Sequence, residues 1–160
     1  MVYGMIRKAQ MSDLKELKKL YKNTIKDNEE NKGSTFPKSY VKKCILYNIA
    51  FVKVENDKII GAYFSEKNQF GNPYVMNKVP FSVLWLHQIM VFPEYQNKGY
   101  GMELMKHYFE LGKSLETKSF RLVCKESLLG YYNKFGFKVL EKNEHKRVQN
   151  DYVMEIRVKE

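Results

Sequence analysis

The alternation of apolar and polar residues divides the chain into short strands and amphipathic helices. A stripe of apolar residues at helical spacing begins at Leu14 and predicts a first helix, for which Ser12 and Asp13 are candidate N-cap residues. Further helices are predicted over three runs: 38–47, 99–112 and 127–135, the last stopped by Gly136. Strands are predicted over seven runs: 3–9, 49–55, 58–65, 84–91, 120–125, 137–140 and 152–158.

The order of these elements predicts an α/β fold, in which a mixed sheet is covered by helices on both faces. Asn56-Asp57 separates two β-rich runs and suits a two-residue hairpin turn. Residues 67–82 have no clear period and contain Gly71, Pro73 and Pro80, so they predict a loop longer than most. Because neither a repeat nor a linker interrupts the chain, residues 1–160 are expected to form a single domain.

The composition is that of a globular protein. Hydrophobic residues make up 44% and aromatic residues 14% of the 160 residues. No run of about 18 apolar residues is available for a membrane span, and the start of the chain lacks the features of a signal peptide. Cys44 and Cys124 are far apart and have no metal-ligand spacing. These features predict a cytoplasmic protein with reduced thiols and no metal.

The net charge of +10 agrees with a nucleic acid, an acidic substrate or an anionic cofactor as partner. The lysines of the first predicted helix are spread at spacings that suit a solvated face, and no block of five or six like charges occurs. The chain also lacks the signature of an RNA-binding sheet and the spacing of a zinc finger. A nucleic-acid partner is therefore not expected.

The most informative segment runs from the strand 84–91 through Pro93 to Gln96-Asn97-Lys98-Gly99-Tyr100-Gly101, where a helix begins. A helix N-terminus has unpaired N–H groups and a partial positive charge, and glycines let the backbone approach a ligand closely. The segment therefore suits a pyrophosphate. It matches neither the dinucleotide fingerprint nor the P-loop, and two glycines alone also agree with a tight turn that binds nothing.

Gln96-x-x-Gly99-x-Gly101, behind a strand ending Val91-x-Pro93, resembles the acyl-CoA signature of the GNAT superfamily of N-acetyltransferases. Downstream, Tyr132-Asn133-Lys134-Phe135-Gly136-Phe137 resembles the Tyr-x-Lys-x-Gly-Phe segment of that family. The resemblance is strongest over 84–137 and implies a mixed sheet of about seven strands flanked by about four helices. It also implies that the sheet is splayed between the strand ending at Val91 and the strand 120–125.

The resemblance implies transfer of an acetyl group from acetyl-CoA to a primary amine by direct attack in a ternary complex. The acceptor would be a small molecule, a peptide N-terminus or a lysine, and the protein a monomer or a homodimer. Backbone groups of the strand end would contact the pantetheine arm, and the N–H groups of the following loop would contact the pyrophosphate. The implied cofactor-binding residues are Ile89, Met90, Val91, Gln96, Asn97, Lys98, Gly99, Tyr100, Gly101 and Met102.

Tyr132 occupies the position of the family's general acid, which would stabilise the departing thiolate. A phenol and a thiol have ordinary pKa values of about 10 and 8.5, so the phenol can donate a hydrogen bond to the thiolate. The alternative is that the Tyr132 ring only packs on its helix beside Leu128 and Phe135. The sequence departs from the family's pattern before Tyr132, because Lys125 stands where many relatives place an asparagine that contacts the cofactor.

The group that deprotonates the amine is less clearly indicated. Some family members use a glutamate at a position that holds Trp85 here, and tryptophan cannot accept a proton. His87 is a candidate base because histidine titrates near neutral pH, whereas Glu94 suits a solvated position at the rim. A lone strand histidine is more often structural, so deprotonation relayed by water, without a single essential base, is the default expectation. Two other functions also remain open: an acyl-CoA-binding sensor without catalysis, and a basic RNA-associated protein with this fold.

Overall fold

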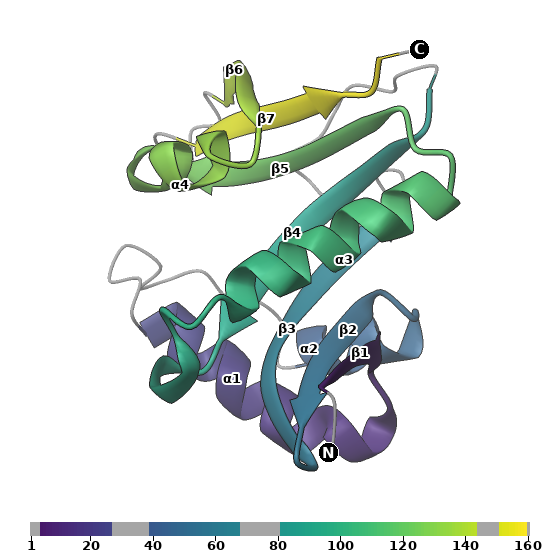
Figure 1. The fold of residues 1–160 in the computed structure, drawn as a ribbon, viewed down its shortest axis with the longest axis vertical. Coiled ribbons are helices and arrows are strands. Elements are labelled where there is room, and N and C mark those ends of the chain that lie inside the picture. The colour runs from purple at the N-terminus through teal and green to yellow at the C-terminus, as the bar shows by residue number, and fades with distance from the viewer. Residues whose placement is uncertain (1–3, 27–38, 68–80, 144–150, 160) are drawn as a thin grey trace. The chain divides into compact units, whose positions relative to one another are not determined.

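The computed structural model describes residues 4–26, 39–67, 81–143 and 151–159 (Figure 1). Its strands are β1 (Met5–Lys8), β2 (Ala50–Glu55), β3 (Lys58–Lys67), β4 (Val83–Val91), β5 (Ser119–Lys125), β6 (Lys138–Asn143) and β7 (Asp151–Arg157). Its α-helices are α1 (Leu14–Lys26), α2 (Tyr40–Leu46), α3 (Tyr100–Ser114) and α4 (Leu129–Asn133). The order of elements is the predicted one, and the boundaries differ by a few residues.

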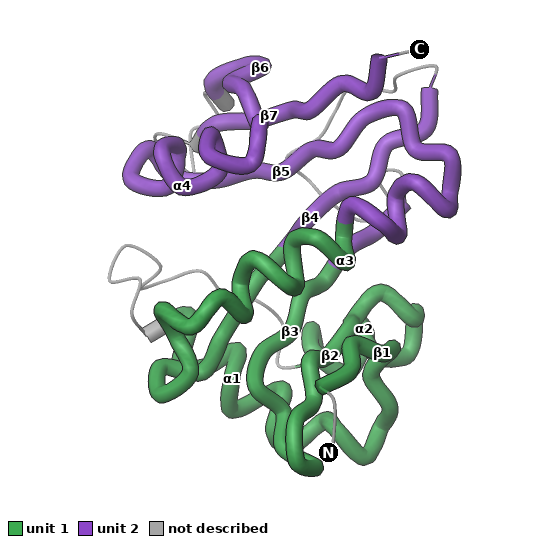
Figure 2. The backbone as a smooth tube through the Cα atoms, in the orientation of Figure 1, with its two compact units in different colours: residues 1–64, 88–108 green, residues 65–87, 109–160 purple. Residues whose placement is uncertain are grey.

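The strands form a mixed sheet in the order β1-β2-β3-β4-β5-β7-β6. β4 and β5 are parallel, and the other recorded ladders are antiparallel. The parallel ladder pairs Val83–Leu86 with Ser119–Leu122, and both strands continue beyond these residues. The chain divides into two compact units, residues 1–64 with 88–108 and residues 65–87 with 109–160 (Figure 2). They are called unit 1 and unit 2 below.

Unit 1 packs helices on both faces of its strands. The apolar stripes of α1 and α2 meet the inward residues of β2 and β3, and Leu17, Val52 and Phe64 there are fully buried. Because successive strand residues point to opposite faces, Phe51 and Tyr63 face the other way. Their rings stack with centroids 4.9 Å apart, and Tyr108 of α3 contacts Tyr63 on that side. The predicted two-sided cover of the sheet is thus confirmed in unit 1.

Unit 2 has a separate aromatic core. Phe109 packs edge-on against Phe120 and also contacts Phe137, with centroid distances of 5.2 and 6.0 Å. A Cβ on Gly112 would collide with the ring of Phe120, so this glycine allows α3 to lie close to β5. The prediction that the helix ends at Gly112 is therefore wrong. Gly112 serves packing inside the helix, which continues to Ser114.

Two local sequence signals, the Asn56-Asp57 turn and the start of the first helix, had different outcomes. Asn56 and Asp57 have φ angles of 50° and 62°, which confirms the predicted hairpin turn between β2 and β3. The predicted N-cap residues are wrong, since a 3-10 turn at Met11–Asp13 precedes α1 and Gln10 is its N-cap. Asp13 instead accepts a hydrogen bond from the Gln10 N–H at 2.7 Å and pairs with Arg7 at 2.8 Å.

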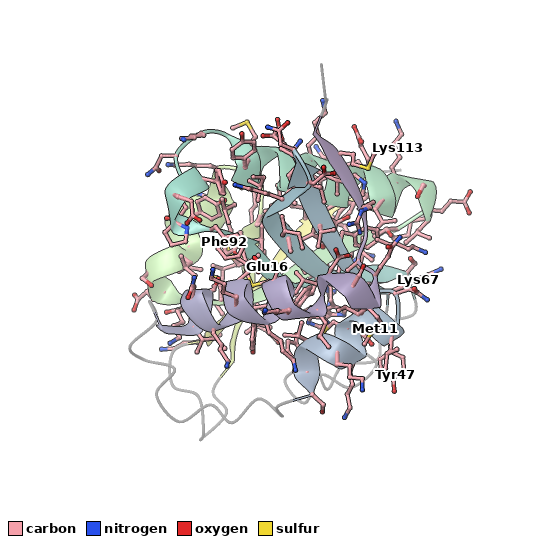
Figure 3. All side chains as sticks on the ribbon, turned by 90° about the horizontal axis from the view of Figure 1, so that it is seen from below. Met11, Glu16, Tyr47, Lys67, Phe92 and Lys113 are labelled. Carbon is pink, nitrogen blue, oxygen red and sulfur yellow. The ribbon has the colours of Figure 1, made fainter. Side chains whose placement is uncertain are left out.

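Charged side chains cover the outer face of α1, where Glu16 is exposed together with Lys18, Lys19 and Lys22 (Figure 3). This confirms the interpretation of the helix's lysines as a solvated face. Cys44 and Cys124 are buried and form no disulfide. Within the described ranges, no helix is both long enough and apolar enough to span a membrane. Most of the predicted loop 67–82 lies outside the described residues, and its first residue, Lys67, belongs to β3.

Candidate functional site

The connection between β4 and α3 is a tight turn with unusual backbone angles. A 3-10 turn at Pro93–Tyr95 follows β4, and Asn97 and Gly99 then adopt φ angles of 61° and 88°. A Cβ built on Gly99 would meet no other atom within 4 Å. Crowding within the chain is therefore not what requires glycine at this position. Backbone conformation requires it, and the glycine leaves open space beside the loop.

α3 begins directly after this turn. Its hydrogen-bond ladder starts where the Glu103 N–H donates to the Gly99 carbonyl at 3.1 Å. The N–H groups of the first helical residues precede that ladder, as at every helix start, and carry a partial positive charge. Residues 97–99 are exposed, and so is Met102, whose side chain is 66% accessible. An anion can therefore reach this helix start from solvent.

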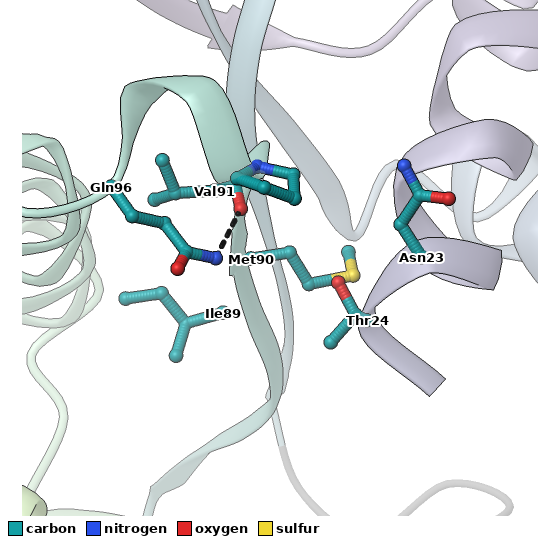
Figure 4. A pocket seen from close by; sticks show the side chains of 7 residues that line it. Asn23, Thr24, Ile89, Met90, Val91 and Gln96 are labelled. Carbon is teal, nitrogen blue, oxygen red and sulfur yellow. Dashed lines mark hydrogen bonds between the residues drawn. The ribbon is translucent and has the colours of Figure 1, made fainter. Parts of the chain in front are cut away.

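The end of β4 lines a pocket of about 270 Å³ in unit 1. Its walls are Ile89, Met90, Val91, Pro93 and Gln96 on one side and Asn23 and Thr24 of α1 on the other (Figure 4). Gln96 Nε2 donates a hydrogen bond to the Val91 carbonyl at 3.0 Å, which ties the loop to the strand it leaves. The predicted pantetheine residues and Gln96 thus line one pocket.

Gly61 of β3 sets the position of β4 beside this pocket. A Cβ on Gly61 would lie 2.5 Å from the Met90 carbonyl oxygen and 3.3 Å from Val91 Cα. Glycine is therefore needed for the close approach of the two backbones. One residue earlier, the Ile60 carbonyl accepts a hydrogen bond from the Phe92 N–H at 3.0 Å, and the Phe92 side chain is buried (Figure 3).

His87 of β4 is paired within unit 2. Its Nε2 lies 2.9 Å from Oε2 of Glu66 on β3, and both side chains are largely buried. When Nε2 donates a hydrogen bond to the carboxylate, the tautomer with its proton on Nε2 leaves a lone pair on Nδ1. Trp85, at the position of the family's glutamate, is 1% exposed and packs with Val83 and Val153.

Tyr132 of α4 belongs to unit 2 and is half-buried among aromatic rings. Its neighbours are Tyr131 and Phe137, with centroid distances of 5.1 and 6.1 Å, whereas Phe135 contacts Tyr131. Burial raises the pKa of the Tyr132 phenol, and Tyr131 and Cys124 add smaller effects in the same direction. The hydroxyl therefore stays protonated through the neutral range.

The remaining predicted residues are accounted for more simply. Lys98 is exposed, and its Nζ lies 5.9 Å from the centroid of the Tyr95 ring. Glu94 is exposed in the turn, which agrees with a rim position. The sequence did not predict three residues that contribute to the site: Glu66, which pairs with His87, and Asn23 and Thr24, which line the pocket. Thr24 interrupts the apolar stripe of α1, and this could have been noticed; its hydroxyl donates to the Leu20 carbonyl at 2.9 Å.

Comparison with known proteins gives a family. The family model described as Acetyltransferase (GNAT) family matches residues 16–137, about three quarters of the chain. No relative was found among curated protein sequences.

Several solved structures share the fold. An acetyltransferase of the GNAT family from Listeria monocytogenes has 17% identity and a TM-score of 0.75, and the match covers 97% of this chain and 95% of that one. Arabidopsis thaliana Naa50, solved with a bisubstrate analogue of CoA and a peptide, has 17% identity and a TM-score of 0.70, with coverages of 97% and 99%. N-acetylglutamate synthase from Neisseria gonorrhoeae, complexed with coenzyme A and N-acetyl-glutamate, has 13% identity and a TM-score of 0.75. The match covers all of this chain but only 36% of that synthase.

Proposed function

This chain belongs to the GNAT family of acetyltransferases, and we propose that it transfers the acetyl group of acetyl-CoA to a primary amine in a ternary complex. The observation that carries the proposal is the exposed turn before α3. Gly99 there has a φ of 88°, and a Cβ would meet only open space. Such a turn at a helix start suits the pyrophosphate of a coenzyme.

The residues of unit 1 fit this donor in two places. The N–H groups from Asn97 to Met102 are offered to the pyrophosphate, where the partial positive charge of the helix start favours an anion. The pocket beside Ile89, Met90 and Val91 offers strand backbone and amide side chains to the pantetheine arm, which itself contains two amides. The coenzyme supplies an activated acyl group as a thioester.

The reaction exchanges one bond for another. The amine nitrogen bonds to the acetyl carbonyl carbon, the carbon–sulfur bond breaks, and the thiolate takes up one proton while the amine loses one. We assign Tyr132 the stabilisation of the thiolate. Because burial raises its pKa, the phenol suits donation of a hydrogen bond to sulfur better than complete proton transfer.

The amine must lose a proton before or during attack, since free alkylamines have a pKa of about 10.4 and are mostly protonated at neutral pH. We assign this proton to His87 and keep deprotonation through water as the alternative. The contact with Glu66 supports the assignment. It holds the proton on Nε2, leaves Nδ1 as the acceptor, and stabilises the imidazolium that would form.

Thiol release from acetyl-CoA tests the proposal. The acceptor panel should include an amino-acid α-amine and a peptide N-terminus, because solved neighbours are complexed with N-acetyl-glutamate and with a bisubstrate analogue of CoA and a peptide. A lysine peptide and small-molecule amines complete it. Turnover of any amine supports the enzyme. A protein that binds CoA but turns over none would instead be a sensor, and RNA binding that falls steeply with salt would favour the RNA-associated alternative. The buried thiols support the further proposal of a cytoplasmic location.

A further inference from the structure

The turn that precedes α3 is tied down by side chains at both ends. At its start, Gln96 donates to the Val91 carbonyl at 3.0 Å. At its end, the Tyr100 hydroxyl donates to Oε2 of Glu55 at 2.8 Å. Glu55 is the last residue of β2 and lies 45 positions away in sequence. Tyr100, which lies between Gly99 and Gly101, is thus hydrogen-bonded to β2, a strand that carries none of the family's motifs.

The Glu55 carboxylate belongs to a small charged cluster in unit 1. Lys53 Nζ lies 2.9 Å from Glu103 and 3.8 Å from Glu55, and the lysine side chain is only 8% exposed. This lysine therefore balances two carboxylates close to the helix start. The hydrogen bond to Glu55 also raises the pKa of Tyr100, with smaller contributions from burial and from the charges of Glu55 and Glu103. The phenol consequently remains a donor at neutral pH.

We infer that Tyr100 and Glu55 are positioning residues, which hold the phosphate-binding turn in its binding conformation before the coenzyme arrives. This inference rests on the proposed function. Asn97 and Gly99 lie in the left-handed region, which is only one of several conformations open to asparagine and glycine in a free chain. We call the Tyr100–Glu55 hydrogen bond the tether. Without it, the turn would have to be ordered when the coenzyme binds, and that ordering lowers affinity. The tether removes this cost in advance.

Glu55 could affect CoA binding in two ways: its negative charge would weaken binding of an anion, and its hydrogen bond to Tyr100 would strengthen binding. Variants that change one property at a time separate the two effects. Tyr100→Phe removes the hydrogen bond but keeps the ring and leaves the Glu55 charge near the anion site. A net hydrogen bond corresponds to about a twofold to tenfold change, so the Kd for CoA should rise by about that factor. Glu55→Gln keeps an acceptor for Tyr100 and removes a negative charge, so the Kd should stay within about twofold or fall. Glu55→Ala removes both the acceptor and the charge, so its Kd should rise by no more than that of Tyr100→Phe.

The experiment is calorimetric titration with CoA, together with steady-state kinetics on an accepted amine. Glu94→Gln is the matched control, because it removes an exposed charge in the same turn without removing a tether. Because Tyr100→Phe keeps the backbone N–H of this residue and removes only its hydroxyl, we expect it to raise the KM for acetyl-CoA by a larger factor than it changes kcat or the KM for the amine. Equal Kd values for wild type and Tyr100→Phe would overturn the inference, as would a loss confined to kcat.

Hydrogen exchange of the protein without ligand separates this inference from the proposed function. The Glu103 amide, the first in the ladder of α3, should exchange faster in Tyr100→Phe than in wild type. If wild-type protein binds no CoA, the proposed function fails, whatever the exchange rates are. If it binds CoA and the Glu103 amide exchanges equally in both proteins, only the tether is refuted.

Discussion

The two segments that carry the family's motifs are held in place by different kinds of interaction. In the β4–α3 turn, the geometry comes from backbone angles at Asn97 and Gly99 and from two side-chain hydrogen bonds, and most residues are exposed. In the α4 segment, Tyr132 is held by aromatic packing against Tyr131 and Phe137. The first segment can bind a ligand through backbone N–H groups, which do not depend on the kind of side chain. In the proposed reaction, the second segment would act through the single hydroxyl of Tyr132.

The comparison shows where a motif is informative. A glycine at φ 88° with open space around it has no packing role, so a requirement for glycine there points to conformation or to a ligand. A tyrosine whose ring is surrounded by rings would be kept for packing even if its hydroxyl did nothing. The following variants test the two segments, from the largest expected effect to the smallest.

Gly101→Glu should abolish measurable CoA binding. The new side chain would bring a carboxylate to the first turn of α3, where the pyrophosphate is proposed to lie. The fold should survive, because an acidic residue in the first turn of a helix is favourable. Titration with CoA and a thermal melt measure the two effects. Gly101→Ala is the control that adds a Cβ without charge, and near-native affinity of Gly101→Glu would exclude this turn from the site.

Tyr132→Phe should lower kcat and kcat/KM together by about 10²–10⁴-fold, the usual contribution of general acid catalysis. The ring and its packing are kept, so stability and CoA affinity should hardly change. Because burial raises the pKa of this phenol, wild-type activity should show no loss from its ionisation below about pH 10. Retention of more than about a third of wild-type kcat would leave Tyr132 with a packing role only.

His87→Ala should lower kcat by about tenfold or more if the ring accepts the amine proton. Glu66→Gln is the informative partner variant: it preserves the size of the side chain but removes the carboxylate that holds the proton on Nε2. We expect a smaller loss in kcat and unchanged KM for acetyl-CoA. If both variants keep wild-type kcat across pH, deprotonation proceeds through water.

Gly99→Ala should weaken CoA binding by about tenfold, because an L-residue in the left-handed region costs about 1–2 kcal/mol and shifts the turn. A Cβ would meet no atom of the chain, so the loss cannot come from overpacking in the free protein. Asn97→Gly is the matched control, since glycine accepts the φ of 61° at that position. Equal losses in both variants would point to disordering of the turn rather than to the backbone angle.

Lys98→Ala should have the smallest effect, a CoA affinity reduced by no more than about fivefold, as expected for an exposed charge. The difference should vanish in about 1 M salt, where exposed charges are screened within about 3 Å. Lys113→Ala, which removes a lysine from the last turn of α3, is the control for the loss of one positive charge. A larger loss that persists in high salt would show a direct contact between Lys98 and the phosphates.

Local sequence determined much of the fold. Helical stripes, the Asn56-Asp57 turn and the helix stop before Gly136 each depend on a few consecutive residues, and the structure bears them out. The turn between β4 and the start of α3 was predictable for the same reason, since its local signals lie within six residues, 96–101. The end of α3 was misjudged because the role of Gly112 lies in its contact with Phe120, which local sequence does not reveal.

Contacts between distant residues were decided by the tertiary structure alone. The Glu66–His87 pair joins residues 21 positions apart, and the Tyr100–Glu55 bond joins residues 45 apart. Both depend on how strands are paired and where a helix crosses them, and a shift of one residue would turn each strand side chain to the opposite face. Asn23 and Thr24 likewise became part of a pocket only through the packing of α1. The sequence therefore determined which backbone groups of the turn are available to the proposed coenzyme. The tertiary structure determined which distant side chains contact the turn and the other site residues.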